Sequence, residues 1–264
     1  MIRFPSATHH ALVLFGLDLK KSLTSLRGLW PYLRDLRTLR RQLALHDPSF
    51  AIGKLYPCLT DRGAPNGSTD NVYFHQDLLV ARRVHANNPV VHVDVGSRVD
   101  GFVAHVASFR AIRVIDVRQM TTVIPNVDFV RMDLMAEIPS QMNECCDSLS
   151  CLHALEHFGL GRYGDPVQWN GHLLGLANLA RLLKPNGRLY FSVPIGPLRI
   201  EFNAHRVFSL SYLLRQFDGT FAIDRFSYIG DDGDLREHVP LSGLQVESNF
   251  GCRMGCGIFE LIKL

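Results

Sequence analysis

Residues 90–102 read VVHVDVGSRVDGF, and this stretch decides the fold. Its first six residues are mostly apolar and β-branched, which predicts a buried β-strand over 90–95. Asp94 lies near the end of that strand, and Gly96 and Ser97 follow it in a turn. A glycine directly after the first strand lets a ligand approach the backbone closely. The stretch therefore predicts the first strand of an open α/β sheet, with a ligand site at its carboxyl end.

Further apolar runs of the same kind follow along the chain. They occupy residues 111–117, 127–132, 146–152, 188–193, 222–229 and 257–263, and helical patterns cover 73–87 and 169–183. Strands that alternate with helices predict a mostly parallel sheet covered on both faces. Few residues are left for a helix between the last two runs, which favours a terminal antiparallel hairpin. We therefore expect a Rossmann-like, doubly wound sheet of seven strands.

Acidic residues lie at the ends of the second and third predicted strands. Asp116 comes twenty residues after Gly96, and Val117 follows it. Asp133 ends the third strand and is followed by Leu134. An acid in the place of Asp116 commonly accepts hydrogen bonds from ribose hydroxyls. Because the carboxyl ends of parallel strands share one edge of the sheet, these positions predict a site for a nucleoside-containing ligand.

Three parts of the chain resemble the ordered motifs of class I S-adenosylmethionine-dependent methyltransferases. They are the 94–96 turn with the acids at 116 and 133, CDSLSCLHALEHF at 146–158, and ARLLKPNGRLYFSVP at 180–194. In the last, Pro185 cannot continue the helix, and Gly187 is expected to turn the chain into the fifth strand. The resemblance covers about residues 88–264. It is closest to an uncharacterised methyltransferase-like family associated with cell-surface polysaccharide genes.

The resemblance implies a cofactor, S-adenosylmethionine, and a set of residues that bind it. Gly96 and Ser97 would approach the methionine part, and Asp94 would hold the turn and the cofactor amine. Asp116 would bind the ribose, and Asp133 the adenine amino group. The implied cofactor-binding residues are Asp94, Gly96, Ser97, Asp116, Val117, Asp133 and Leu134.

The turn after the first strand departs from the methyltransferase pattern. The superfamily favours Asp/Glu-x-Gly-x-Gly-x-Gly, but Arg98 and Asp100 stand at the second and third glycine positions. Gly101 lies one residue late and is expected to compensate in part. This departure keeps open a second function, that of a non-catalytic protein that binds S-adenosylmethionine and lacks a working base.

His157 is the first candidate for a catalytic base. We expect it at the rim where the cofactor methyl group faces the substrate, and a neutral imidazole there can take a proton from a hydroxyl. His205 and Arg206 follow the fifth strand and are further candidates, because a guanidinium fork suits a carboxylate or phosphate. The loop at 159–166 is expected at the mouth, with Tyr163 able to stack on a sugar. The predicted reaction is O-methylation of a sugar or surface-glycan precursor, in which the glycan rests on the family association alone.

The segment at 153–157 has a competing interpretation. His153, Glu156 and His157 fit H-x-x-E-H, the inverted zinc-protease motif, in which two histidines on one helical face bind Zn²⁺ and the glutamate acts as base. A third ligand such as Glu201 or Glu237 would be required. The segment directly follows a predicted strand, which favours the methyltransferase interpretation, so we predict no metal site.

The positive charge of the chain is concentrated near its start. The net charge is +3, but residues 1–47 hold eight Lys and Arg against three Asp and Glu, a net +5, which leaves −2 for the rest. A near-neutral remainder argues against a nucleic-acid substrate. Leucines at three- and four-residue steps over 17–45 predict an amphipathic helix, kinked or divided at Pro31. This helix either packs on the main domain or contacts a membrane surface or a protein through its basic face.

These observations predict two parts, a basic helical extension with a connecting segment over 1–71 and a methyltransferase-like domain over 72–264. Six cysteines are too few for a disulfide scaffold. No apolar run reaches the roughly 18 residues of a membrane span, and no clear cleavage site follows the short apolar stretch near the start. We therefore expect a reduced, cytoplasmic protein, which the basic helix would bring to the inner membrane surface if it binds lipid.

Overall fold

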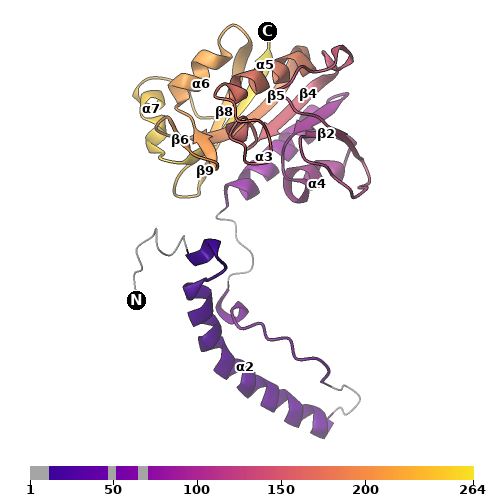
Figure 1. Ribbon diagram of the computed structural model, residues 1–264, viewed down its shortest axis with the longest axis vertical. Helices are drawn as coiled ribbons and strands as arrows, with labels where there is room; N and C mark the ends of the chain where they lie inside the picture. Colours follow the sequence, from indigo (N-terminus) through magenta and orange to yellow (C-terminus); the bar gives the residue numbers. More distant parts are fainter. Residues whose placement is uncertain (1–11, 47–51, 65–70) are drawn as a thin grey trace. The chain divides into compact units, whose positions relative to one another are not determined.

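The computed structural model describes residues 12–46, 52–64 and 71–264 (Figure 1). The chain divides into two compact units, residues 1–68 and 69–264. The expectations for the first eleven residues and for parts of the connecting segment, 47–51 and 65–70, lie outside the described residues.

The first unit is built on one long helix, α2 (Leu19–His46). Pro31 lies inside this helix, which stays continuous and curves along its length (Figure 1), so the proline does not divide it. Residues 52–64 contain the 3-10 helix η1 (Asp61–Gly63) and run back along α2 (Figure 1). The backbone of Leu59 lies where a side chain at Gly28 would begin, so glycine is required at that crossing.

The second unit contains one large sheet. Its strands are β1 (His92–Val95), β2 (Ile112–Asp116), β3 (Val127–Arg131), β4 (Cys146–Leu152), β5 (Leu183–Ile195), β8 (Phe221–Ile229), β9 (Leu235–Arg236) and β10 (Gly255–Lys263). They lie in the order β3-β2-β1-β4-β5-β10-β8-β9. Strands β1 to β5 are parallel to one another, whereas β10 runs antiparallel to both β5 and β8.

Helices cover both faces of this sheet. On one face, α3 (Val72–Asn87) and α4 (Ala104–Ala107) share a core with β2. On the other, α5 (Gly171–Leu182) and α6 (Leu210–Phe217) share a core with β4 and β5. The remaining elements are the π-helical turn η2 (Val99–Val103), the 3-10 helices η3 (Ser140–Met142), η4 (Leu155–His157) and η5 (Asn249–Gly251), the hairpin β6 (Arg199–Glu201) and β7 (His205–Val207), and α7 (Leu244–Glu247).

The predicted fold is confirmed as a Rossmann-like, doubly wound and mostly parallel sheet with an antiparallel C-terminal part. In the described residues the sheet has eight strands instead of seven, because the two-residue β9 pairs with the end of β8 and forms an edge. The last two predicted strands are antiparallel neighbours, but α7 and β9 lie in the chain between them.

The Lys-Pro-Asn-Gly segment differs from its expected form. The structure continues directly from α5 into β5 at Leu183, so the segment lies within the strand. Asn186 has the left-handed backbone conformation, with φ +61°, that was expected of Gly187. The pairing register between β4 and β5 shifts across this segment, which therefore forms a bulge.

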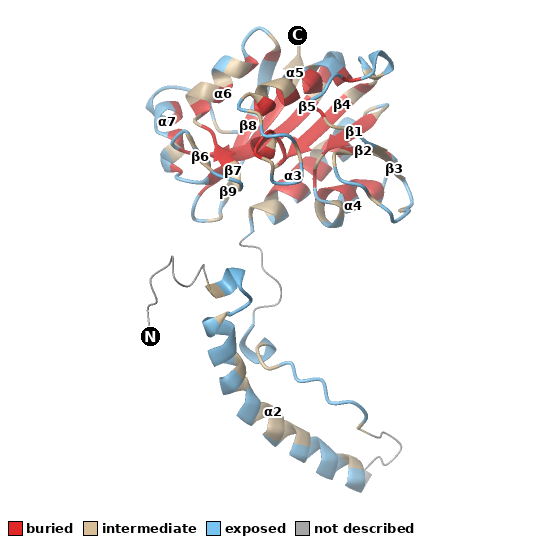
Figure 2. Ribbon diagram, viewed as in Figure 1, coloured by how far each residue is buried: buried red, intermediate tan, exposed pale blue. Residues whose placement is uncertain are grey.

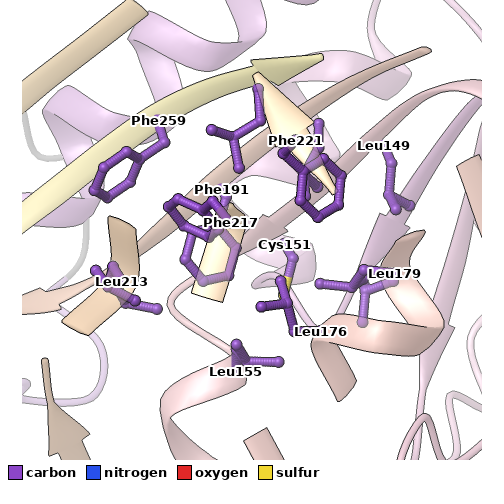
Figure 3. Close-up of a cluster of buried hydrophobic side chains, with 14 of the residues drawn as sticks. Leu149, Cys151, Leu155, Leu176, Leu179, Phe191, Leu213, Phe217, Phe221 and Phe259 are labelled. Atoms are coloured by element: carbon purple, nitrogen blue, oxygen red, sulfur yellow. The ribbon is translucent and has the colours of Figure 1, made fainter. Parts of the chain in front are cut away.

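The core on the α5 and α6 face is rich in aromatic side chains (Figure 3). The ring centre of Phe191, on β5, lies 5.6 Å from that of Phe217 on α6 and 6.3 Å from that of Phe259 on β10. The buried residues concentrate in the central strands (Figure 2). All six cysteines are free thiols, of which Cys58 is exposed and Cys145 is half-buried. The central strands are therefore packed on both faces and carry the core of this unit.

Candidate functional site

A cavity of about 260 Å³ lies at the carboxyl ends of the parallel strands β1 to β4. Open α/β sheets bind ligands in this place, beyond the carboxyl ends of the strands where the strand order reverses. Six of the ten residues that the sequence singled out line it: Gly96, Asp116, Val117, Asp133, Leu134 and His157. The other four, Asp94, Ser97, His205 and Arg206, do not belong to its lining.

Asp94 lies completely buried beneath the turn that follows β1. Its carboxylate accepts hydrogen bonds from the backbone N–H of Ser97 (3.1 Å), the Ser97 hydroxyl (2.6 Å) and the Ser150 hydroxyl (2.5 Å). Burial raises the pKa of Asp94 from its ordinary 3.8 to about 6, although these hydrogen bonds oppose the rise. Asp94 and Ser97 thus hold the turn from below, and neither belongs to the cavity lining, so the contact of Asp94 with the cofactor amine stays a prediction.

Replacing Asp94 with asparagine should change how stability depends on pH. Because the pKa of Asp94 is about 6 when folded and 3.8 ordinarily, the folded protein retains a proton between pH 4 and 6 that the unfolded chain releases. Ionised Asp94 therefore costs the native state about 3 kcal/mol at neutral pH. Relative to Asp94→Asn, the wild type should lose about that much unfolding free energy between pH 4 and pH 7 in urea titrations.

The matched control for this prediction is Asp128→Asn, whose carboxylate is exposed on β3 and pairs with Arg113. This variant should keep the wild-type pH profile. Identical profiles for wild type and Asp94→Asn would contradict the assignment of the raised pKa to the buried carboxyl.

Gly96 has a backbone conformation and a location that exclude a side chain. Its φ is +71°, in the left-handed region, and its N–H donates to the carbonyl of Ile115 (2.9 Å). A Cβ at this position would lie 2.8 Å from the Cβ of Ala154, closer than real Cβ atoms approach. The turn therefore requires glycine, which leaves the backbone open to the cavity.

Arg98 and Asp100, which stand at the missing glycine positions, pair with each other. Arg98 donates from Nε and Nη2 to the two carboxylate oxygens of Asp100, at 3.1 and 2.8 Å. The guanidinium carbon of Arg98 lies 5.5 Å from the ring centre of Tyr73, which also lines the cavity. Gly101 instead faces α3, because a Cβ there would meet the carboxylate of Asp77. Gly101 therefore does not compensate for the missing glycines at the cavity.

Asp116 and Asp133 present carboxylates at the ends of neighbouring strands. Arg118 donates to Asp116 from its backbone N–H (2.8 Å), Nε (3.0 Å) and Nη2 (2.6 Å), which fixes the orientation of that carboxylate. Asp133 accepts a hydrogen bond from the backbone N–H of Met135 (2.8 Å). Each carboxylate oxygen has two lone pairs, so both residues can accept further hydrogen bonds from a ligand.

His157 ends η4 and faces the cavity with one free nitrogen. Its Nδ1 lies 2.6 Å from the backbone carbonyl of Ala204, to which it donates, so the neutral ring carries its lone pair on Nε2. Burial lowers the pKa of His157, so the imidazole is neutral at pH 7. Its Nε2 lies 3.8 Å from Oε1 of Glu156. His157 therefore has the tautomer and the charge state of a general base.

His153 and Glu156 form a buried pair beside His157. The Nδ1 of His153 lies 2.9 Å from Oε1 of Glu156, which is 1% exposed. Burial by itself would lower the pKa of His153 and raise that of Glu156. The neighbouring Cys256 and Glu156 instead raise the pKa of His153, and the attraction of His153 lowers that of Glu156. His153 is therefore positively charged and Glu156 negatively charged, and this ion pair lies beside the cavity.

The geometry does not suit the zinc-protease interpretation. That motif needs a helix through both histidines, whereas η4 spans three residues and His153 precedes it with a left-handed φ of +50°. Glu156 pairs with His153 instead of standing free as a base. Within the ranges that the structure describes, no group of three or more His, Cys, Asp or Glu is placed to hold a metal ion.

His205 and Arg206 lie on β7, away from the cavity lining. His205 pairs through Nε2 with Glu201 across the β6–β7 hairpin (3.2 Å). Arg206 is 4% exposed and donates to three backbone carbonyls, those of Glu156 (3.4 Å), Phe158 (2.5 Å) and Trp169 (3.4 Å). The expected grip of Arg206 on a substrate is therefore replaced by a positioning role, in which it holds η4 and the loop after it.

Tyr73, Arg118 and Arg162 also line the cavity, although the sequence analysis gave them no role. The guanidinium carbons of Arg118 and Arg162 lie 4.6 and 5.3 Å from the ring centre of Tyr163, and the His157 ring meets it edge-on at 5.4 Å. The glycine-rich 159–166 loop was expected at the mouth and does line the cavity. Arg162 could have been predicted as a cavity residue, because it is adjacent to Tyr163 in that loop.

Comparison with solved structures identifies similar folds. The [4+2]-cyclase SpnF is 16% identical over 72% of this chain and 80% of its own, with a TM-score of 0.50. A Burkholderia thailandensis 1,6-didemethyltoxoflavin-N1-methyltransferase, solved with S-adenosylhomocysteine, is 15% identical over 74% of this chain and 79% of its own (TM-score 0.49). The N-methyltransferase NodS from Bradyrhizobium japonicum WM9 is 13% identical over 86% and 97% (TM-score 0.46). At these identities the likeness to SpnF shows the fold alone.

Comparison of sequences gives a family but no characterised relative. A search of curated proteins found no match. None of the comparisons links the chain to polysaccharide genes, so that part of the resemblance is not supported. A family model matches residues 104–241, which is just over half of the 264 residues and includes the second and third strand ends, η4 and the mouth loop. The chain therefore belongs to the family described as "Caenorhabditis protein of unknown function, DUF268".

Proposed function

We propose that this protein is an S-adenosylmethionine-dependent methyltransferase that methylates an oxygen atom. The carrying observation is the cavity at the strand ends, where Gly96, Asp116 and Asp133 line one wall and His157 lines another. These are the positions through which the sequence resembles class I methyltransferases.

The donor and acceptor groups of the cavity fit this cofactor. Asp116 and Asp133 offer acceptors, which ribose hydroxyls and an adenine amino group require. The open backbone at Gly96 leaves space for close approach of the methionine part. When bound, S-adenosylmethionine supplies an electrophilic methyl group on a positively charged sulfur.

His157 would accept the proton that the acceptor hydroxyl loses as its oxygen gains the methyl group. The proton would go to Nε2, because Nδ1 is held by the Ala204 carbonyl. The buried carboxylate of Glu156, 3.8 Å from that nitrogen, stabilises the imidazolium that forms. Tyr163 and Phe158 also line the cavity and exclude water from the reacting atoms.

We further propose a sugar or surface-glycan precursor as the acceptor. The support is the mouth loop, where Tyr163 presents an aromatic ring that is partly exposed and lies beside the proposed base. Rings of this kind stack on the apolar faces of sugars.

Titration calorimetry of the full chain with S-adenosylmethionine and S-adenosylhomocysteine tests the proposal, with NAD as a nucleotide control. We expect both adenosyl compounds to bind at micromolar concentration and NAD to bind at least tenfold more weakly. Failure of both to bind at millimolar concentration would overturn the proposal. If S-adenosylmethionine binds but no acceptor is methylated, the result would favour the non-catalytic alternative. The Arg98–Asp100 pair in place of the glycines supports that alternative.

The first unit supports a second proposal, that α2 lies on an anionic membrane surface at the cytoplasmic face. An apolar stripe along the helix consists of Leu19, Leu23, Leu26 and Trp30, whose exposed fractions run from 38% to 68%. A basic stripe beside it, at seven-residue steps, consists of the exposed Lys20, Arg27, Arg34 and Arg41. Apolar residues beside a basic row suit a helix that lies in the interface of anionic lipids. None of the helices in the described residues has the length and apolar character needed to cross a bilayer.

Trp30 fluorescence tests this membrane proposal in the full chain. With Trp169→Phe as background, which leaves Trp30 as the single tryptophan, vesicles containing phosphatidylserine should shift the emission to shorter wavelength. Replacing Arg27, Arg34 and Arg41 with glutamine should weaken vesicle binding on the order of a hundredfold, since each basic residue contributes about 1 kcal/mol. Equal shifts with pure phosphatidylcholine vesicles, or no shift at all, would contradict the proposal.

A further inference from the structure

The loop that follows η4 is held in one shape by a single carboxylate. Asp165 accepts hydrogen bonds from the backbone N–H groups of Gly159 (2.9 Å), Gly161 (3.2 Å) and Tyr163 (3.1 Å). Gly159 and Gly161 both have positive φ, at +75° and +71°. The loop is therefore tied to its own end, which fixes the backbone from which Arg162 extends.

Arg162 lies directly beside the proposed base. Its Nη1 donates to the carbonyl of Ala204 (2.8 Å), the same oxygen that accepts from His157 Nδ1, and the two nitrogens lie 3.5 Å apart. Its guanidinium also contacts the ring of Tyr163. One carbonyl uses one of its five N–H donors, and the side chain remains exposed in the cavity wall.

Arg162 differs from the other two arginines of the cavity in its charge partner. Arg98 is paired with Asp100, and Arg118 is paired with Asp116, each at 2.8 Å or less. Among the residues that the structure describes, no carboxylate lies within 4 Å of the Arg162 guanidinium nitrogens. The cavity thus offers one guanidinium without an acidic partner, and it offers this group next to His157.

We propose that Arg162 binds an anionic group of the methyl acceptor, a carboxylate or a phosphate, and so places the acceptor hydroxyl at His157. A guanidinium presents paired N–H donors that match both anions, and the cavity wall leaves these donors free of carboxylates. This inference deepens the proposed function and rests on it. It narrows the sugar acceptors to acidic ones, such as uronic acids or sugar phosphates.

Anion binding at Arg162 has a direct effect on His157. The groups that face His157 are Glu156, Arg162, His153 and the Tyr163 ring. Burial lowers the pKa of His157 most, and the positive charge of Arg162 lowers it further. An anion on Arg162 offsets that positive charge and should raise the pKa of His157, so the acceptor itself makes the base stronger.

Nuclear magnetic resonance of the His157 imidazole tests this without methyl transfer. The resonance is assigned by its loss in His157→Asn, and the full chain is titrated with acetate and with inorganic phosphate, using chloride at equal ionic strength as control. We expect a saturable shift and a raised His157 pKa with at least one of the two anions and none with chloride. A shift with acetate would indicate an acceptor with a carboxylate, and a shift with inorganic phosphate would indicate an acceptor with a phosphate.

Arg162→Gln should weaken this anion binding at least tenfold, whereas Arg215→Gln, which removes an exposed charge from α6, should leave it unchanged. The same titrations with saturating S-adenosylhomocysteine should retain the shift, and Arg162→Gln should leave the affinity for that compound unchanged. No saturable shift, an unchanged shift in Arg162→Gln, or loss of the shift with S-adenosylhomocysteine would each overturn the inference. The titrations without S-adenosylhomocysteine need no cofactor, so their outcome is independent of whether the proposed cofactor binds.

Discussion

Replacing His157 with asparagine should lower methyl transfer by a factor on the order of 10² to 10⁴, because a positioned general base contributes about that much. Asparagine keeps a donor for the Ala204 carbonyl, to which His157 Nδ1 donates at 2.6 Å, but it has no nitrogen lone pair in place of Nε2. The loss should therefore fall on the rate and not on the affinity for S-adenosylhomocysteine. Release of that product, with the best acceptor from a screen of neutral and acidic sugars, measures the rate.

The pH profile separates a base from a residue that only supports the fold. Because burial lowers the pKa of His157 below its ordinary 6.5, the wild-type kcat/KM should be flat near neutral pH and fall only under more acidic conditions. His157→Asn should lack that acidic limb. His105→Ala, which removes an exposed histidine from α4, is the control and should retain it. Unchanged turnover in His157→Asn would exclude His157 as the base.

Replacing Gly96 with valine should reduce the affinity for S-adenosylhomocysteine by at least about a hundredfold. A β-branched residue is a clear outlier at φ +71°, and its Cβ would begin 2.8 Å from the Cβ of Ala154. The turn after β1 must then shift, and with it the backbone wall of the cavity. Titration calorimetry measures the change in affinity.

Gly219→Val is a matched control for that variant. Gly219 has nearly the same φ, +69°, but nothing lies within 4 Å of the position of its Cβ, and it is not part of the cavity lining. Both variants carry the backbone strain, which should cost each of them on the order of 1 to 2 kcal/mol of stability, and Gly96→Val adds the clash with Ala154. Only Gly96→Val should lose ligand affinity. Equal affinities in the two variants would show that the turn does not form the ligand site.

The fold and one wall of the site were predictable because their signals are local. Each parallel strand is a short apolar, β-branched run, and the residues at its end are adjacent in sequence. The rule that parallel strands share a carboxyl edge then brings Gly96, Asp116 and Asp133 together without any knowledge of side-chain packing. The same rule gives no information on which neighbours fix those side chains, such as the Arg118 pair with Asp116.

The opposite wall was less predictable because its contacts join distant segments. Arg206 was expected to face a substrate, but its guanidinium donates hydrogen bonds to backbone carbonyls of residues that lie 37 to 50 positions earlier in the chain. The tautomer of His157 likewise depends on the carbonyl of Ala204, 47 residues away. Backbone carbonyls carry no sequence signature, so neither partner could be read from residue types. The expectation that Gly101 compensates for the missing glycines was wrong for a related reason, because its neighbour Asp77 lies on α3, distant in sequence.

The cavity lining runs from Tyr73 to Asp165, and the strands β5, β8 and β10 contribute no lining residue. The cavity is thus lined by one continuous stretch of the chain, and the residues after it support this stretch without lining the cavity. A chimera that exchanges residues 71–166 between two members of the family should carry its donor's specificity. Such an exchange needs two anchors in the recipient, a main-chain carbonyl at position 204, which any residue supplies, and the Arg206 side chain, which only arginine supplies. Members that carry arginine at position 206 are therefore the suitable partners for such an exchange.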